Sequence, residues 1–205
     1  MKDKDSDYFR NEQKKKLFYT LSIVCYELKK SYICVAFYLK NIETMTINVE
    51  ERVERARNYF LEGYNCAQAV VMAFDDVMAM DVNLLAQLTA PFGGGMGRMR
   101  EVCGTVSGMT FVAGALAPSA DPKNLEERKN NYALVQMFAD KFRAENGDIV
   151  CRRLLGLEPM QIQAETAMPS ERTAEYYKKR PCVEYVACAA RIVAEHINNL
   201  NETRN

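Results

Sequence analysis

Apolar residues recur every three or four positions along most of this chain, which is the spacing of amphipathic helices. Capping residues, prolines and glycines mark where each helix should begin and end. Helices are predicted over residues 49–61, 66–80, 82–89, 101–116, 121–145, 149–155 and 181–199. A polar, irregular stretch before the last helix should hold at most one helical turn, near residues 171–178. No alternating strand pattern runs for more than a few residues, so we predict an all-α fold, a compact bundle of about six or seven helices.

Several of these helix starts rest on specific capping residues. Asn48 with Glu51 three residues later is the pattern of an N-cap and its acidic partner. Asn65 and Asp81 are expected to cap the next two helices, and Pro181 is the favoured first residue of the last one.

The stretch from Phe92 to Gly108 departs most from ordinary helix composition, because it contains Gly93-Gly94-Gly95 and further glycines. Glycine allows positive φ angles and the close approach of another surface. A nucleotide-binding P-loop would need Gly-Lys-Ser or Gly-Lys-Thr where Arg98-Met99-Arg100 stands. A dinucleotide site would need a preceding strand, which the pattern does not predict.

Three of these glycines, Gly94, Gly95 and Gly104, are candidates for binding a cofactor. The alternative is a turn between two helices that binds no ligand. Gly104 and Gly108 are four residues apart, so they share one helix face and should let a second helix pack closely. We expect Gly108 to matter for packing rather than for chemistry.

Composition narrows the function classes. The 205 residues suggest one domain, and 27 Lys and Arg against 27 Asp and Glu give no electrostatic case for binding nucleic acid. The single histidine, His196, disfavours a histidine-rich metal site or a Ser-His-Asp triad. Seven cysteines without a visible secretory signal favour a reducing, cytoplasmic setting, where cysteines are more often metal-binding or redox-active than structural.

The first 44 residues differ from the rest of the chain. Their apolar runs are each shorter than the roughly 20 residues of a membrane span, and Lys29-Lys30 separates them. We interpret residues 1–44 as an extension that is not native or not packed, and residues 45–205 as the helical redox domain. Cys25 and Cys34 would then have no function, and a chain beginning at Met45 should fold.

Four cysteines each open a predicted helix: Cys66, Cys103, Cys151 and Cys182. Helix N-termini favour negative charge and therefore stabilise a thiolate. We expect the four sulfurs to line one site, as ligands or as redox groups. Cys103 should be the most acidic thiol, because it follows the loop that begins with Gly93-Gly94-Gly95 (the glycine loop) and lies near Arg98 and Arg100. The alternative for these two arginines is that they are simply solvated.

Other residues that could take part in chemistry have simpler interpretations. Cys188 lies in the middle of the last predicted helix and should belong to the core. His196 should be a surface or half-buried residue. Methionines at apolar helix positions are expected to pack rather than to act as ligands, Met72, Met78, Met109 and Met137 among them.

These motifs resemble a family of small redox-active proteins named for four cysteines and a central CGAxxG block, the C_GCAxxG_C_C family. The matching stretches are residues 63–70, 92–108, 151–156 and the helix from Cys182. Thr105 departs from the pattern, which has alanine there. The resemblance implies that the four helix-opening cysteines are the functional set. It also implies kinship with the non-haem part of split-Soret cytochromes, and hence an iron–sulfur cluster as a cofactor.

Three functions remain open at this point. The first is an electron carrier in which the four cysteines ligate an iron–sulfur cluster. The second is a thiol–disulfide oxidoreductase that uses two of them. The third is a structural zinc site with four cysteine ligands in an interaction module, which is ranked last because closely spaced cysteine pairs are absent. The expected partner is a redox protein, with no nucleic acid and no membrane span, and a homodimer is left open.

Overall fold

A computed structural model describes residues 45–163 and 166–202. Its α-helices are α3 (Val49–Leu61), α4 (Cys66–Met72), α5 (Asp75–Met78), α6 (Val82–Thr89), α7 (Gly104–Leu116), α8 (Leu125–Asn146), α9 (Cys151–Leu154), α10 (Pro159–Gln163), α11 (Ala174–Lys179) and α12 (Cys182–Glu202), with a 3-10 helix η1 (Ala90–Phe92). Within this part of the chain there are ten α-helices, six of them with seven or more residues, and no strand. The predicted all-α class is confirmed. The interpretation of residues 1–44, with Cys25 and Cys34, falls outside the described residues.

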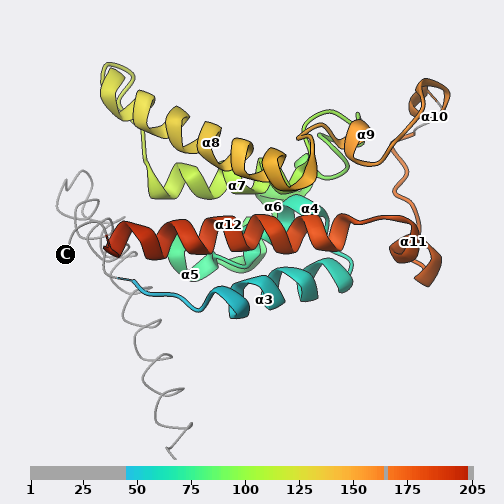
Figure 1. Cartoon of the computed structure of the whole chain (residues 1–205), viewed down its shortest axis with the longest axis horizontal. Coiled ribbons are helices and arrows are strands. Elements are labelled where there is room, and N and C mark those ends of the chain that lie inside the picture. The colour runs from blue at the N-terminus through green and yellow to red at the C-terminus, as the bar shows by residue number, and fades with distance from the viewer. Residues whose placement is uncertain (1–44, 164–165, 203–205) are drawn as a thin grey trace, which may run out of the picture.

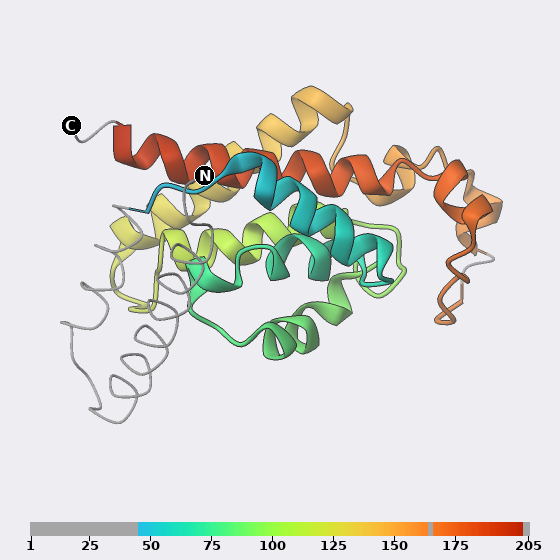
Figure 2. The same ribbon diagram turned by 90° about the horizontal axis from the view of Figure 1, so that it is seen from below.

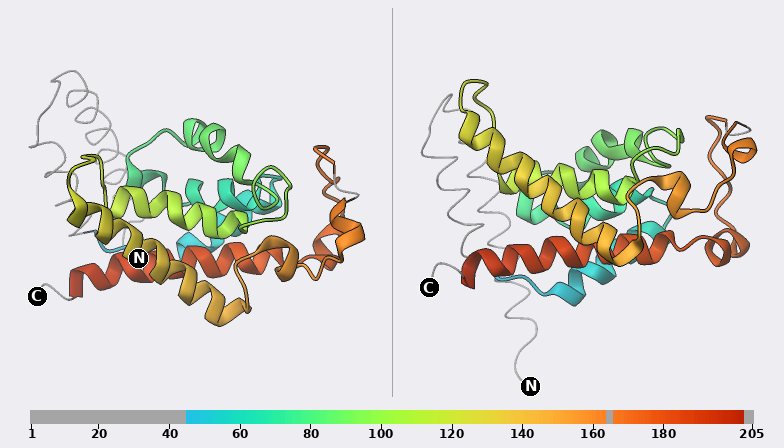
Figure 3. Two further views of the ribbon diagram at one scale, coloured as in Figure 1. Left: turned by 90° about the horizontal axis from the view of Figure 1, so that it is seen from above. Right: turned by 45° about the horizontal axis from the view of Figure 1, so that its top comes forward.

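The long helix α12 runs through the middle of the molecule (Figure 1). Helix α3 lies along one side of α12, whereas α7 and α8 lie on the other, and α12 contacts α3, α4, α7 and α8. Figure 2 and Figure 3 show α10 and α11 at the end of the molecule where α12 begins. The first residues of α12 are therefore the ones that meet this segment.

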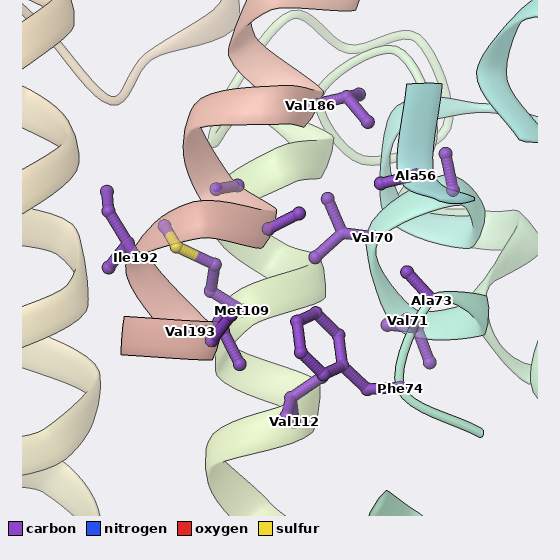
Figure 4. Packing of buried hydrophobic residues seen from close by; sticks show 14 of the residues in the cluster. Ala56, Val70, Val71, Ala73, Phe74, Met109, Val112, Val186, Ile192 and Val193 are labelled. Carbon is purple, nitrogen blue, oxygen red and sulfur yellow. The ribbon is translucent and has the colours of Figure 1, made fainter. Parts of the chain in front are cut away.

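The core lies between α4, α7 and α12, with α3 closing one side (Figure 4). Met109 and Val112 of α7 and Val193 of α12 are fully buried there. Phe74 and Val70 face them from the α4 side. Because apolar burial is the main stabilising contribution, this cluster fixes how α4, α7 and α12 lie relative to one another.

The predicted caps are present. The Asn48 side chain accepts a hydrogen bond from the Glu51 backbone N–H and begins α3. Asn65 forms a full capping box with Gln68 at the start of α4. Asp81 accepts backbone hydrogen bonds at the start of α6, as predicted.

The single helix predicted over residues 66–80 is wrong, because the structure divides it into α4 and α5. Phe74 leaves helical geometry, with φ −123° and ψ 26°. Arg52 of α3 donates a hydrogen bond to the Ala73 carbonyl at 2.8 Å and pairs with Asp76 at 2.6 Å. A side chain from another helix therefore takes the carbonyl that a continuous helix would have used.

Two other predicted helices begin later than expected. The helix predicted from residue 101 begins at Gly104, and the one predicted from residue 149 begins at Cys151. The residues before each start are extended, and Val102 and Val150 form an antiparallel bridge. Pairing between the two segments replaces the first helical turn of each.

The long helix predicted over residues 121–145 begins four residues later, at Leu125, and its first apolar residues are not buried. Phe138 and Phe142 are buried, but Leu125 and Tyr132 are 70% and 60% exposed. The helix begins at Leu125, with Asn124 as its N-cap, so its first turns extend beyond the core. Gly147 ends it as the C-cap. The polar stretch that follows contains α10 as well as the expected turn, which is α11.

Candidate functional site

A cavity of about 40 Å³ lies where the starts of four helices meet. It is lined by Asn65, Cys66, Gly94, Gly95, Arg100, Cys103, Gly104, Cys151, Leu154, Leu155, Arg172, Tyr176, Arg180, Cys182 and Tyr185. The structure thus brings together all four helix-opening cysteines and the three candidate cofactor-binding glycines. Cys103 is the N-cap of its helix rather than a member of the first turn, and the other three are first residues of theirs.

Close packing of α4 against α7 brings Cys66 and Cys103 to the same place. A Cβ added at Gly104 would lie 3.1 Å from Cys66 Cβ and 3.2 Å from the Ala67 nitrogen. A Cβ at Gly108 would lie 2.9 Å from Val70 Cβ. An added side chain would force a shift at Gly108 and would be tightly packed at Gly104, which supports the packing role predicted for both.

Backbone pairing brings Cys151 beside Cys103. The Cys103 N–H donates to the Ile149 carbonyl at 2.8 Å, and the Cys151 N–H donates to the Glu101 carbonyl at 2.6 Å. These bonds flank the bridge between the two extended segments. The pairing places two cysteines that are 48 residues apart in the sequence on one wall of the cavity.

The glycine loop closes over Cys151. Gly94 and Gly95 have φ values of +64° and +73°, and a Cβ at Gly95 would lie only 2.7 Å from Cys151 Cβ. Arg98 and Arg100 also have positive φ, which is a strained conformation for residues with a side chain. Arg100 is 2% exposed, so the interpretation of this residue as solvated is wrong. The loop presents its buried guanidinium to the cysteines.

Cys66 and Cys182 form a hydrogen-bonded pair of thiols. The Cys66 S–H donates to Cys182 Sγ, and this bond lowers the pKa of Cys182 to about 7 despite the opposing effect of burial. The charges of Arg180, Arg172 and Arg100 act in the same direction. The same hydrogen bond, together with burial, raises the pKa of Cys66. The first proton of the pair is therefore lost near pH 7, and the negative charge then lies on Cys182.

The expectation that Cys103 is the most acidic thiol is contradicted. Burial raises the pKa of Cys103 to about 12, although a hydrogen bond with the Thr105 hydroxyl, 3.0 Å from the sulfur, works against it. Burial also raises the pKa of Cys151, and the charge and hydrogen bond of Arg100 only partly offset this effect. At Cys103 and Cys151, desolvation raises the pKa more than the helix N-terminus lowers it. At Cys182, a thiol donor and three arginines lower the pKa.

Apart from the cysteines, the charged side chains that line the cavity are all positive. Arg100, Arg172 and Arg180 line it, and none of the described residues that line it is an aspartate or glutamate. Arg172 stacks on Phe60 with 4.5 Å from Cζ to the ring centroid, and Arg180 stacks on Tyr176 at 5.0 Å. The cysteines are the acidic groups that these guanidinium groups face.

Sequence reasoning missed Arg172, Arg180 and Tyr176 as residues of the site. Arg180 lies two residues before Cys182, so its position along the chain offered a signal. Arg172 comes from the polar stretch that was interpreted as irregular, and no local pattern distinguishes it from other surface arginines.

The remaining candidates lie away from the cavity. Cys188 is half-buried at the edge of the core and accepts a hydrogen bond from Asn146 Nδ2 at 3.2 Å. His196 is half-buried and packs edge-on against Phe138, and burial lowers its pKa. Met72, Met78 and Met109 are buried, and Met137 packs against the core, as expected.

Four cysteines are suitable ligands for a metal centre, but their side chains are not arranged around one. Four thiolates are the usual ligands of iron–sulfur clusters and also serve structural zinc. Among residues 45–163 and 166–202, however, no three His, Cys, Asp or Glu side chains are arranged to hold one metal ion. The cavity also has room for only about three water-sized spheres of about 10–15 Å³ each. A cluster would require the side chains to rearrange.

Fold and site together define a small all-α protein whose four thiols surround a positively charged cavity. The chain belongs to the family described as "Putative redox-active protein (C_GCAxxG_C_C)", whose model matches residues 64–196. The match includes all four cavity cysteines, and it confirms the resemblance found from the motifs. No curated protein and no solved structure matches the chain. None of the helices in the described ranges has both the length and the apolar character needed to cross a membrane.

Proposed function

We propose that this protein is a thiol–disulfide redox protein in which Cys66 and Cys182 exchange two electrons with a substrate that contains a sulfur–sulfur bond. The observation that carries the proposal is that Cys66 and Cys182 open two helices into the same cavity, where the interaction with Cys66 and the nearby arginines lower the pKa of Cys182. Two thiols that line one cavity can become a disulfide when their Cα atoms come within about 7 Å of each other. One of them is already the reactive thiolate near neutral pH.

Each thiol has a separate role. The Cys182 thiolate attacks one of the two bonded substrate sulfurs and releases the other as a thiolate. Cys66 then gives its proton to the released sulfur, attacks Cys182 Sγ and releases the second substrate sulfur as a thiolate. The substrate gains two electrons, and the two thiols of the protein become one disulfide.

The surrounding residues support this division of roles. Arg172, Arg180 and Arg100 stabilise negative charge on Cys182. Cys103 and Cys151 are buried and have raised pKa values, so they stay protonated while the pair reacts. In this proposal they shape the wall of the cavity and do not exchange electrons.

Oxidation of the full chain tests the proposal. Reduced protein is equilibrated with mixtures of oxidised and reduced dithiothreitol, the free thiols are alkylated, and disulfides are mapped by peptide mass spectrometry. We expect one disulfide between Cys66 and Cys182, which is lost in Cys66→Ser and Cys182→Ser. Cys188→Ser is the matched control, because Cys188 lies in the same helix as Cys182 but outside the cavity. A disulfide between Cys103 and Cys151, or no disulfide among the four, would contradict the proposal.

An iron–sulfur electron carrier is the second candidate. The observation in its favour is the convergence of four thiols from four separate segments on one cavity. Anaerobic purification followed by iron and acid-labile sulfide analysis distinguishes the two functions. Stoichiometric iron and sulfide that depend on all four cysteines would replace the dithiol proposal with a cluster. Stoichiometric zinc would instead support the third function considered from the sequence.

A further inference from the structure

The cavity beside Cys182 combines positive charge with very small size. Arg100, Arg172 and Arg180 line it, and no carboxylate from the described chain does. Arg172 and Arg180 also form no ion pair with an aspartate or glutamate elsewhere in the described ranges. Their charge is therefore available to an anion in the cavity.

The Arg172 guanidinium is held in place by its neighbours, but one of its nitrogens has an unused hydrogen-bond donor. Its guanidinium lies over the rings of Phe60 and Tyr176, at 4.5 and 4.9 Å. One terminal nitrogen, Nη2, donates to the Tyr64 carbonyl at 3.3 Å. The other, Nη1, is buried and has no hydrogen-bond partner among the residues that the structure describes. A buried guanidinium nitrogen without an acceptor is costly, and an anion in the adjacent cavity would supply the acceptor.

Cavity volume restricts what that anion is. About 40 Å³ accommodates about three non-hydrogen atoms, since one water-sized sphere occupies about 10–15 Å³ of such a cavity. A peptide disulfide, or a small thiol that carries carboxylates, is far larger. Among anions of this size, those made of sulfur are the ones that react with a thiol pair by exchange.

Resting on the dithiol function proposed above, we propose that the cavity binds inorganic sulfur anions, the hydrodisulfide ion HSS⁻ as oxidant and the hydrosulfide ion HS⁻ as its reduction product. The Cys182 thiolate attacks the protonated sulfur of HSS⁻ and the sulfur–sulfur bond of the anion breaks. The proton of the attacked sulfur passes to the leaving sulfur, which gives a Cys182 persulfide anion and one HS⁻. The Cys66 thiol then attacks Cys182 Sγ and gives its proton to the departing sulfur. The products are the Cys66–Cys182 disulfide and a second HS⁻, so the sulfur–sulfur bond of the substrate is reduced by two electrons.

The arginines place the persulfide on Cys182 rather than on Cys66. All three guanidinium groups act on Cys182. The terminal sulfur of a Cys182 persulfide carries negative charge and would lie among them. Cys66 receives no such stabilisation and is the partly exposed member of the pair, which suits it to release the product sulfur.

The reverse reaction gives a clean test. The full chain is first oxidised, and the Cys66–Cys182 disulfide is confirmed by peptide mapping. Sodium sulfide is then added at fixed pH, and the products are trapped with iodoacetamide. We expect one additional sulfur atom on the peptide that contains Cys182. We expect Arg172→Gln to slow this reaction by about tenfold, because it removes one nearby positive charge.

Three controls separate charge from access and folding. Arg128→Gln changes a half-buried arginine of α8 that does not line the cavity, and it should leave the rate unchanged. A neutral phosphine should reduce the disulfide equally fast in all variants, because it carries no charge for the arginines to attract. In the unmodified protein at constant ionic strength, chloride, which fits the cavity, should slow the sulfide reaction relative to gluconate, which does not.

The outcomes distinguish this inference from the function on which it rests. If the disulfide between Cys66 and Cys182 does not form, both are overturned. If it forms but the added sulfur appears on Cys66, the proposed function stands and the sulfur-anion site is wrong. An unchanged sulfide rate both in Arg172→Gln and in chloride would overturn the site in the same way.

Discussion

Gly108 of α7 lies so close to Val70 of α4 that a Cβ added to the glycine would be 2.9 Å from Val70 Cβ. The Ala67 carbonyl would be only 3.1 Å away. Helices α4 and α7 carry Cys66 and Cys103 at adjacent ends, so this contact sets the spacing of two cavity cysteines. The approach of the two helices is thus part of the site as well as of the core.

Gly108→Ala should therefore destabilise the protein by about 1–3 kcal/mol, the usual cost of overpacking. Gly114→Ala is the matched control, because Gly114 lies in the same helix with no neighbour within 4 Å of an added Cβ. That substitution should be neutral or stabilising by about 0.4–1 kcal/mol. Urea unfolding of both variants measures the difference, and equal stability of the two would show that α4 and α7 can separate freely.

The parts of the site that follow local rules could be predicted from the sequence. Asn65 and Pro181 mark the helix starts at Cys66 and Cys182, and capping chemistry is a local property. The spacing of Gly104 and Gly108 likewise predicted close packing. These features depend on a few neighbouring residues, which is why a single sequence contains them.

The parts that depend on contacts between distant segments could not be predicted. The bridge between Val102 and Val150 leaves no local pattern, and it shortened two predicted helices. The break at Ala73 comes from the Arg52 side chain, 21 residues earlier. The acidity assigned to Cys103 was wrong for a related reason, since burial depends on the whole fold and outweighs the helix end.

Gly95→Ala should cost more stability than Gly97→Ala. Both glycines have positive φ, +73° and +56°, so the backbone strain of an alanine is similar at the two positions. Only at Gly95 would the new Cβ meet Cys151 Cβ at 2.7 Å, whereas at Gly97 the nearest atom is 3.9 Å away. We expect an additional loss of about 1–3 kcal/mol for Gly95→Ala, measured by urea unfolding. Equal losses would mean that the loop moves away from Cys151 without cost.

The ion pair of Arg52 with Asp76 should make the stability of the protein decrease at low pH. Burial alone would raise the pKa of Asp76, but the hydrogen bond and charge of Arg52 outweigh burial and lower it. A carboxyl group whose folded pKa is lowered stabilises the protein above its unfolded pKa, and this contribution is lost as pH falls through the folded value. Stability should therefore decrease below about pH 4, the region of an unperturbed aspartate.

Arg52→Met tests that pair directly. The substitution leaves Asp76 with the Val77 backbone hydrogen bond and the weaker contact to Arg55 at 3.8 Å, and it removes the Arg52 hydrogen bond to the Ala73 carbonyl. We expect a loss of about 3 kcal/mol at pH 7, at the lower end for a broken buried pair. The acid dependence between about pH 5 and about pH 3 should become shallower at the same time. Lys129→Met, which breaks an exposed pair with Glu126, should change neither.

The acidity of Cys182 leads to the most direct prediction about the site. In reduced protein, the ultraviolet absorbance of thiolates should rise in a step with its midpoint near pH 7, and Cys182→Ser should remove that step. The midpoint should move upward in Cys66→Ala, which lacks a donor to Cys182 Sγ, and much less in Cys66→Ser, whose hydroxyl can still donate. Cys188→Ser should leave the step in place, because burial raises the pKa of Cys188 to about 11. A step that persists in Cys182→Ser and disappears in Cys103→Ser would show that the acidic thiol is Cys103. That result would contradict the proposed reactive pair of Cys66 and Cys182.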